Sequence, residues 1–176
     1  MRVPARGFTL PEVVIALAIA ALLLTLAADA YRDWIEDARL MNHARLLAST
    51  MSEARAEAIK RGHRVNLCKS SDGLQCTETG RWDQGILLHG DHDRTGEVEG
   101  PDTVIRFEPP PAGITVTGNR PVANYVSFTS LGQARMLTGA LQMGTFTVCK
   151  RGRRAVEVVL VASGRVRLDR TRAVCA

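Results

Sequence analysis

The stretch Gly7-Phe8-Thr9-Leu10-Pro11-Glu12, with the apolar run at residues 13–28 behind it, decides the fold of this chain. Residues 8–28 number 21 and contain a single charged side chain, Glu12. At about 1.5 Å per residue, a helix of this length crosses a hydrocarbon core of about 30 Å. The sequence therefore predicts one membrane-spanning helix at its N-terminal end.

The residues around the apolar run indicate its orientation. Arg2 and Arg6 precede it, and positive charge stays on the cytoplasmic side, so the C-terminal end points outward. An ordinary secretory signal has a small-residue cleavage site after its apolar region. Residues 27–30, Ala-Ala-Asp-Ala, form only a faint site of this kind. We expect a single-pass membrane protein whose C-terminal part lies outside the cytoplasm.

The stretch at residues 7–12 resembles the leader of type IV prepilins. The resemblance implies that prepilin peptidase cuts between Gly7 and Phe8, that residues 1–7 are a leader peptide, and that Phe8 is then N-methylated. It also assigns Glu12 to filament assembly. A lone carboxylate in a bilayer costs about 2.5–3.5 kcal/mol and needs a cation, which the amino group of Phe8 on the same or a neighbouring subunit supplies. The alternative is a plain signal anchor with an incidental Glu12.

The helical pattern continues beyond the membrane segment. From Tyr31 and Trp34 to Ala58, apolar residues recur at steps of three and four, with charges on the other faces. No Pro or Gly interrupts residues 13–61, and Gly62 supplies a stop. We expect this apolar stripe to pack on a globular head. The expected organisation is a leader at 1–7, a transmembrane and assembly helix at 8–28, its amphipathic continuation at 29–61, and a β-rich head at 62–176.

Beyond residue 62 the pattern changes to short alternating runs separated by turn residues, which is typical of strands. One long helix followed by antiparallel strands predicts an α+β class, with a sheet wrapped against the C-terminal half of the helix. The expected strands are residues 65–68, 85–88, 103–107, 114–116, 125–128, 145–148, 155–161 and 165–168.

Four cysteines lie beyond the membrane segment, and an even number in an exported domain predicts disulfides. Three pairings are possible. We favour Cys68–Cys76, which closes a local loop, and Cys149–Cys175, which ties down the last residues. Zinc is the competing interpretation, and it is weak because the chain has no C-x-x-C and no histidine at ligand spacing from the cysteines.

Segments along the chain resemble the GspH/FimT family of minor pilins and minor pseudopilins. The resemblance implies a type IV pilin fold, a long N-terminal helix packed on an antiparallel β-sheet head, and other pilins as partners. In the FimT branch, a C-terminal Gly-Arg-x-Arg motif, here Gly164-Arg165-Val166-Arg167, is associated with DNA binding in natural transformation. The other segments are residues 52–62, 65–68, 82–85, 105–106 and 144–149, and Phe128 with Gly132.

The charge is polarised along the chain. The formal net charge is +5, yet residues 144–176 hold eight basic and two acidic side chains. In a strand, Arg165 and Arg167 point to one face and Val166 and Leu168 to the other. A Cys149–Cys175 bond would bring the chain after Leu168 back toward Lys150, and the two basic clusters would lie about 20–25 Å apart. The candidate DNA-binding residues are Lys150, Arg151, Arg153, Arg154, Gly164, Arg165, Arg167, Arg170 and Arg172.

Such a stripe would follow several phosphates of a DNA duplex with little base discrimination. Arginine suits this role because its guanidinium donates two hydrogen bonds to one phosphate. No aromatic residue follows Phe146, so single-strand stacking is less expected. The alternative is a solvated basic face, or one that meets acidic neighbours in a filament.

The loop at residues 91–102 has the spacing of a calcium loop. Flanking helices are not expected, and an Asp replaces the bidentate Glu at the last position, so we interpret it as a polar hairpin loop. We expect no metal, no cofactor and, without a catalytic constellation, no enzyme. The residues that fit the calcium spacing are Asp91, Asp93, Thr95, Gly96, Glu99 and Asp102.

The leading hypothesis is a minor type IV pilin that binds double-stranded DNA for uptake. It would be stored in the inner membrane as a single-pass protein with its head in the periplasm, and then assembled into a pilus on the cell surface. The rivals are a GspH-like pseudopilin with a purely structural role in type II secretion, and a pilus priming or adhesion subunit.

Overall fold

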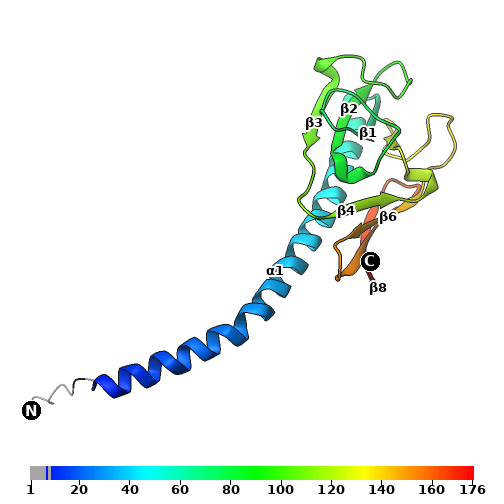
Figure 1. Ribbon diagram of the computed structural model, residues 1–176. Coiled ribbons are helices and arrows are strands. Elements are labelled where there is room, and N and C mark those ends of the chain that lie inside the picture. The colour runs from blue at the N-terminus through cyan, green and yellow to red at the C-terminus, as the bar shows by residue number, and fades with distance from the viewer. Residues whose placement is uncertain (1–6, 8) are drawn as a thin grey trace, which may run out of the picture. The chain divides into compact units, whose positions relative to one another are not determined.

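The computed structural model describes Gly7 and residues 9–176 (Figure 1). The chain divides into two compact units, Met1–Arg39 and Leu40–Ala176. The helix α1, Leu10–Arg61, contributes to both units, and it is the long N-terminal helix that the sequence predicts. The expected membrane boundary after residue 28 stays a prediction.

Thr9 and Glu12 begin α1. The backbone N–H and the Oγ1 of Thr9 each donate to Glu12 Oε2 at 2.9 Å, and the first of these bonds is one half of a capping box. Within the described residues, α1 is long and apolar enough to cross a membrane, with a mean hydropathy of 2.5 in its most apolar window. Its large apolar side chains from Leu10 to Leu24 are exposed, as a segment that faces lipid requires.

Tyr31 and Trp34 correct the expected stripe. Both are exposed, at 62% and 66%, and their rings stack with centroids 6.2 Å apart. They therefore lie outside the packed core. The buried stripe of α1 begins at Leu40 and returns every three or four residues, at Ala44, Leu47, Met51, Ala54 and Ala58.

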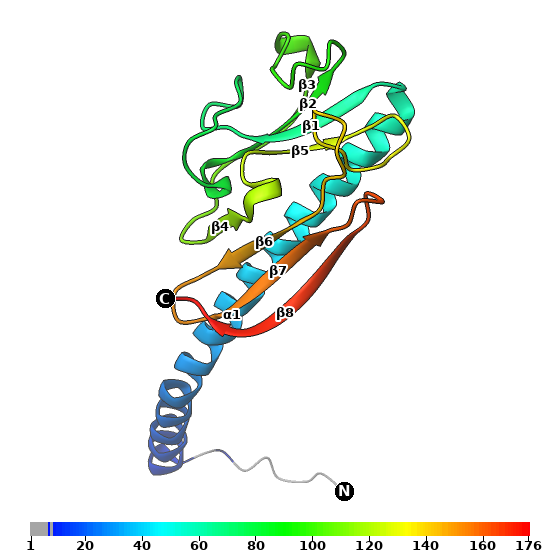
Figure 2. The same cartoon turned by 90° about the vertical axis from the view of Figure 1, so that its right-hand side faces the viewer.

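The head contains two four-stranded sheets where the sequence analysis expected one. Their strand orders are β3-β2-β1-β5 and β4-β6-β7-β8, and every pairing is antiparallel (Figure 2). The strands are β1 Arg64–Lys69, β2 Ile86–Asp91, β3 Val104–Glu108, β4 Thr115–Gly118, β5 Tyr125–Phe128, β6 Gly144–Cys149, β7 Arg154–Leu160 and β8 Val166–Val174.

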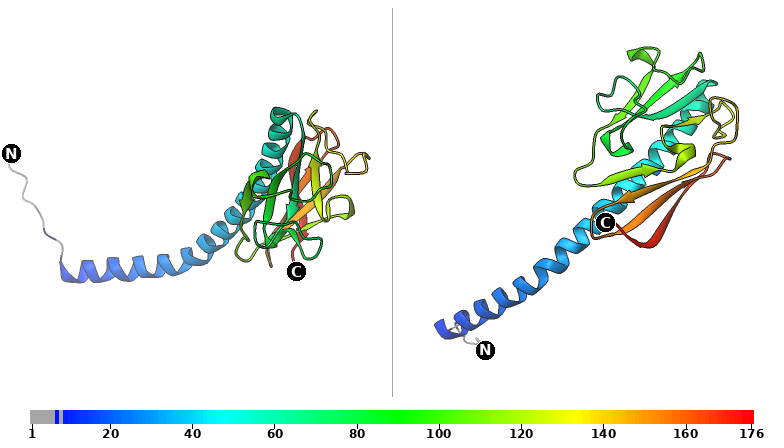
Figure 3. Two further views of the ribbon diagram at one scale, coloured as in Figure 1. Left: turned by 90° about the horizontal axis from the view of Figure 1, so that it is seen from above. Right: turned by 45° about the vertical axis from the view of Figure 1, so that its right-hand side comes forward.

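One hydrophobic core joins α1 to both sheets. Figure 3 shows the strands of the head alongside the C-terminal part of α1. Trp82, in the 3-10 helix η1 (Trp82–Gln84), is 1% exposed, packs edge-on against Phe146 of β6, and donates from Nε1 to the carbonyl of Val122 at 2.9 Å. A bulky aromatic with a bonded N–H links the two sheets at this point.

The last strand differs most from its prediction. The sequence predicts a strand at 165–168, whereas β8 runs from Val166 to Val174 and pairs with β7 over almost its whole length. Arg165 therefore precedes the strand, and Arg170 and Arg172 lie within it. The strand β8 extends beyond residue 168 because β7 provides backbone pairing partners as far as Arg154, which pairs with Val174.

Candidate nucleic-acid interface

The β7–β8 hairpin presents the basic C-terminal region. Its turn is closed by two backbone bonds, from Gly164 N–H to the Val161 carbonyl at 2.8 Å and from Val161 N–H to the Arg165 carbonyl at 3.0 Å. Figure 2 shows β8 at the edge of its sheet, beside β7 alone. The arginines of β8 thus stand on an edge strand, where charged side chains also discourage strand addition.

Gly164 holds the turn against the rest of the head. Its φ is +79°, and a Cβ built there would lie 2.1 Å from the carbonyl oxygen of Gly132. That same carbonyl accepts a hydrogen bond from Nε of Arg55 on α1 at 2.9 Å. Only glycine fits both the left-handed backbone and the close approach, which gives a structural reason for the first residue of the motif.

Arg165 and Arg167 occupy different settings. Arg165 is exposed and makes no side-chain hydrogen bond or ion pair with the described residues. Arg167 faces Val159 across the ladder and forms an ion pair with Asp169 at 3.1 Å. Both groups of this pair are well exposed, at 67% and 46%, so the pair is worth at most about 1 kcal/mol and opens readily.

A second basic cluster gathers at the other end of the hairpin. Cys149 is bonded to Cys175, with Cα atoms 5.7 Å apart, and the N–H of Cys175 donates to the Arg153 carbonyl at 2.8 Å. These bonds bring the β6–β7 turn beside the end of β8. Four exposed arginines make no side-chain hydrogen bond or ion pair in the described part of the chain: Arg151, Arg154, Arg170 and Arg172.

The expected stripe is interrupted in its middle. The two acidic residues of the C-terminal region, Glu157 and Asp169, face each other across β7 and β8. The expected one-faced stripe is therefore not formed: Arg167 and Asp169 share one face with Val159 and Glu157, whereas Arg170 lies on the opposite face with its partner Val156. The six strand steps from Arg154 to Leu160 place the outer ends of the two clusters about 20 Å apart. Their nearest members, Arg167 and Arg170, are three residues apart on β8, about 10 Å.

The processing site falls largely outside the described residues. Phe8 and residues 1–6 are not described, and Gly7 is exposed. The carboxylate of Glu12 is bonded to Thr9. Cleavage after Gly7, methylation of Phe8 and the assembly role of Glu12 therefore stay predictions.

The acidic loop gathers only some of the expected ligands. Oxygens of Asp91, Asp93 and Glu99 lie within 4.8 Å of one another, but Asp102 is outside this group, so the twelve-residue calcium loop is not formed. The loop's own backbone uses these carboxylates: Glu99 accepts from the N–H groups of His92 and Asp93 at 2.6 and 3.1 Å. This pattern is typical of a polar loop.

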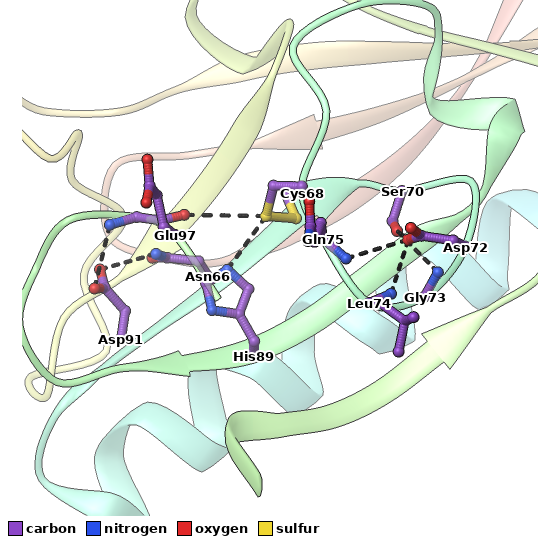
Figure 4. The surroundings of a disulfide bond; sticks show 12 residues. Asn66, Cys68, Ser70, Asp72, Gly73, Leu74, Gln75, His89, Asp91 and Glu97 are labelled. Atoms are coloured by element: carbon purple, nitrogen blue, oxygen red, sulfur yellow. Dashed lines mark hydrogen bonds between the residues drawn. A yellow bond between two sulfur atoms is a disulfide. The ribbon is translucent and has the colours of Figure 1, made fainter. Parts of the chain in front are cut away.

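The first disulfide lies in a buried polar layer on the first sheet (Figure 4). Cys68 is bonded to Cys76, with Cα atoms 5.5 Å apart, the pairing that we favoured over zinc. Beside it, His89 is fully buried, and burial lowers the pKa of its imidazole. Asn66 donates to buried Asp91 at 2.9 Å. These residues therefore form part of the packed interior of the head.

Two cationic residues were missed by the sequence analysis. Lys69 is 2% exposed, and its ammonium donates to the carbonyls of Glu78 and Gly80 and to Asn124. Arg55 lies beside the hairpin turn. Neither stands out in the sequence, because a charged residue in an alternating strand or on a helix flank predicts an exposed position.

Comparisons with known proteins agree with this architecture. Residues 43–164 match the family model of type II transport protein GspH, and residues 3–28 match the prokaryotic N-terminal methylation motif. The first match ends at Gly164, before β8. A search of curated proteins finds no significant match.

Two crystal structures of the type IV minor pilin FimU from Pseudomonas aeruginosa are similar to the chain. One has a TM-score of 0.59 at 18% identity, covering 78% of this chain and 96% of FimU. The other has a TM-score of 0.56 at 17% identity, covering 76% and 98%. The likeness shows that the fold is that of FimU, so the α+β prediction is confirmed.

Proposed function

The chain belongs to the GspH family, and we propose that it is a minor type IV pilin that binds double-stranded DNA through the two arginine clusters of the β7–β8 hairpin. Its N-terminal methylation motif is that of a pilin-type subunit processed by prepilin peptidase. The apolar helix anchors the subunit in the inner membrane, with the head in the periplasm, until assembly with other pilins. The cut between Gly7 and Phe8 and the pairing of Glu12 belong to the same proposal.

One observation carries the DNA proposal: the hairpin exposes unpaired guanidinium groups at both ends. Arg165 stands at the turn and Arg170 and Arg172 at the far end, and none has a hydrogen-bond or ion-pair partner among the described side chains. A duplex carries one negative charge per about 1.7 Å of its axis, so basic residues spread over about 20 Å of the hairpin span several phosphates. Because Arg167 and Arg170 lie on opposite faces of the hairpin, the duplex would contact the edge of β8 rather than one face of the sheet.

The same geometry argues for sequence-independent binding. The clusters lie on an edge strand and a turn, whereas proteins that read bases in the major groove commonly insert a helix there. Contacts with phosphates fix position without reading bases. The proposed role is capture of DNA during uptake, without catalysis.

A gel-shift assay on the soluble fragment of residues 29–176, which contains the whole hydrophobic core, tests the proposal. We expect duplex binding at low salt, weakened about ten-fold in Arg165→Gln/Arg167→Gln because two phosphate contacts are lost. Arg32→Gln/Arg39→Gln removes the same charge from the N-terminal unit and serves as the matched control. Absence of duplex binding, or equal affinity in the two double variants, contradicts the proposal.

The second candidate is a structural pseudopilin of type II secretion, and the GspH description of the matched family favours it. That role needs no free arginines on β8, which lies beyond the matched residues. A pilus priming or adhesion subunit is the third. Loss of secretion, with transformation intact, in a deletion strain would favour the pseudopilin.

A further inference from the structure

A groove of about 400 Å³ runs between α1 and the turn of the β7–β8 hairpin. Ser52, Arg55, Ala56 and Ile59 line it from the helix, and residues 164–166 line it from the hairpin. All of these residues belong to the head unit. The groove thus joins the turn of the Gly-Arg-x-Arg motif to a part of the helix that the motif does not include.

Arg55 has donors to spare in this groove. A guanidinium carries five N–H donors, and Arg55 uses Nε to hold the Gly132 carbonyl. Its remaining donors, on the two Nη atoms, have no partner among the described residues. The structural bond fixes the side chain close to Gly164, because Arg55 Nε lies 3.1 Å from the place of a Cβ on that residue.

The electrostatics of the groove favour an anion. Arg55 and Arg165 both line it, and no lining residue is acidic. The nearest carboxylates along the helix are engaged elsewhere, since Glu53 pairs with Arg106 and Glu57 with Lys60 and Arg61. The hydroxyl of Ser52 donates to the Ala48 carbonyl at 2.9 Å, and its lone pairs add no net charge. Two guanidinium groups in one concave site suit a single phosphate or carboxylate.

We propose that this groove seats one phosphate of the DNA backbone and that Arg55 is a phosphate-binding residue acting together with Arg165. The inference rests on the proposed function and adds a helix residue that the C-terminal motif does not contain. Because Nε is already anchored, Arg55 is pre-organised and loses less side-chain entropy on binding than a free surface arginine. A phosphate is favoured over a carboxylate of a neighbouring pilin because Arg165 is also one of the arginines that the proposed function assigns to duplex binding.

The test uses the full chain in detergent and a fluorescent duplex, with affinity followed by anisotropy over a range of salt. Arg55→Gln should weaken binding about five-fold and lower the slope of log affinity against log salt by about one unit. Arg45→Gln, on the same helix, exposed and outside the groove, is the matched control and should change affinity less than about two-fold.

A second pair of variants separates binding from folding. Ala56 is exposed and lines the groove, so Ala56→Glu puts a carboxylate there without touching the Arg55–Gly132 bond. It should weaken binding at least about five-fold, whereas Ala56→Gln should bind like the wild type. The double variant Arg55→Gln/Arg165→Gln should lose less than the product of the single losses, since both groups contact one phosphate.

The outcomes are distinguishable. If the wild type does not bind duplex, the proposed function fails. If the wild type binds duplex, but Arg55→Gln and Ala56→Glu bind it as tightly as the wild type at every salt concentration, the proposed function stands. The proposed phosphate-binding site in the groove is then overturned. If these variants keep duplex affinity and instead lose binding to a partner pilin, the groove is a protein site and the inference is likewise overturned.

Discussion

The two sheets of the head use their basic residues in opposite ways. On the first sheet, Arg64 donates to the Ser127 hydroxyl at 2.8 Å and to the Arg135 carbonyl at 3.0 Å. Buried Lys69 finds three acceptors. On the second sheet, Arg170 and Arg172 of β8 have no partner among the described residues.

The difference lies in what covers each sheet. The central strands β1 and β2 of the first sheet are buried on both faces, and a buried charge must be hydrogen-bonded. The hairpin of the second sheet ends at an open edge, so its guanidinium groups keep their donors. Cations of the first sheet therefore stabilise the fold, while those of the second are available to an external anion.

Each sheet has one disulfide, and loss of a disulfide is the change that should lower the free energy of unfolding most. Cys149–Cys175 closes a separation of 26 residues and Cys68–Cys76 one of 8. In the chain-entropy model these contribute about 3.5 and about 2.5 kcal/mol to the free energy of unfolding. Urea denaturation of double Cys→Ser variants measures them. Only Cys149→Ser/Cys175→Ser should also weaken duplex binding, since it frees the far end of the hairpin; equal affinity in both variants would refute the division between the sheets.

Lys69→Met should destabilise the head by about 2–3 kcal/mol, because buried acceptors lose their donor. Arg151→Gln, which removes a charge from the exposed cluster, should change the free energy of unfolding by less than about 0.5 kcal/mol. Thermal melting of both variants makes the comparison. Equal melting temperatures would show that the buried ammonium has no structural role.

Acid should destabilise the head through His43 and His89. Burial lowers the pKa of both imidazoles below the ordinary value. In the unfolded chain they take up protons near pH 6.5, whereas the folded head resists protonation, so stability is full above that pH and falls as the pH drops below it. Urea denaturation across this range measures the effect, and His89→Gln should flatten the profile. A stability independent of pH would contradict the assignment.

The sequence predicts the scaffold better than the site. Residues 7–12 and the uninterrupted run to residue 61 indicate a pilin-like helix, because apolar length and spacing are local signals. The division into two sheets depends on long-range contacts such as Trp82 with Phe146, which no local pattern contains.

Within the site, the sequence predicts the arginines but not their partners. The strand register decides that Arg167 pairs with Asp169 and that Glu157 faces Asp169. The place of Arg55 beside Gly164 depends on a helix about a hundred residues away in the chain. The left-handed backbone of Gly164 is the conformation that the turn dipeptide Ser163-Gly164 predicts. Its close approach to the Gly132 carbonyl could not have been predicted from the sequence.

The salt dependence of duplex binding tests the central claim most directly. For the fragment of residues 29–176, the account predicts a steep linear fall of log affinity with log salt. Replacing the four arginines at the disulfide end of the hairpin should lower that slope by about one unit for each phosphate contact removed. The variant is Arg151→Gln/Arg154→Gln/Arg170→Gln/Arg172→Gln. An unchanged slope in this variant, with the fold intact by circular dichroism, would contradict the account.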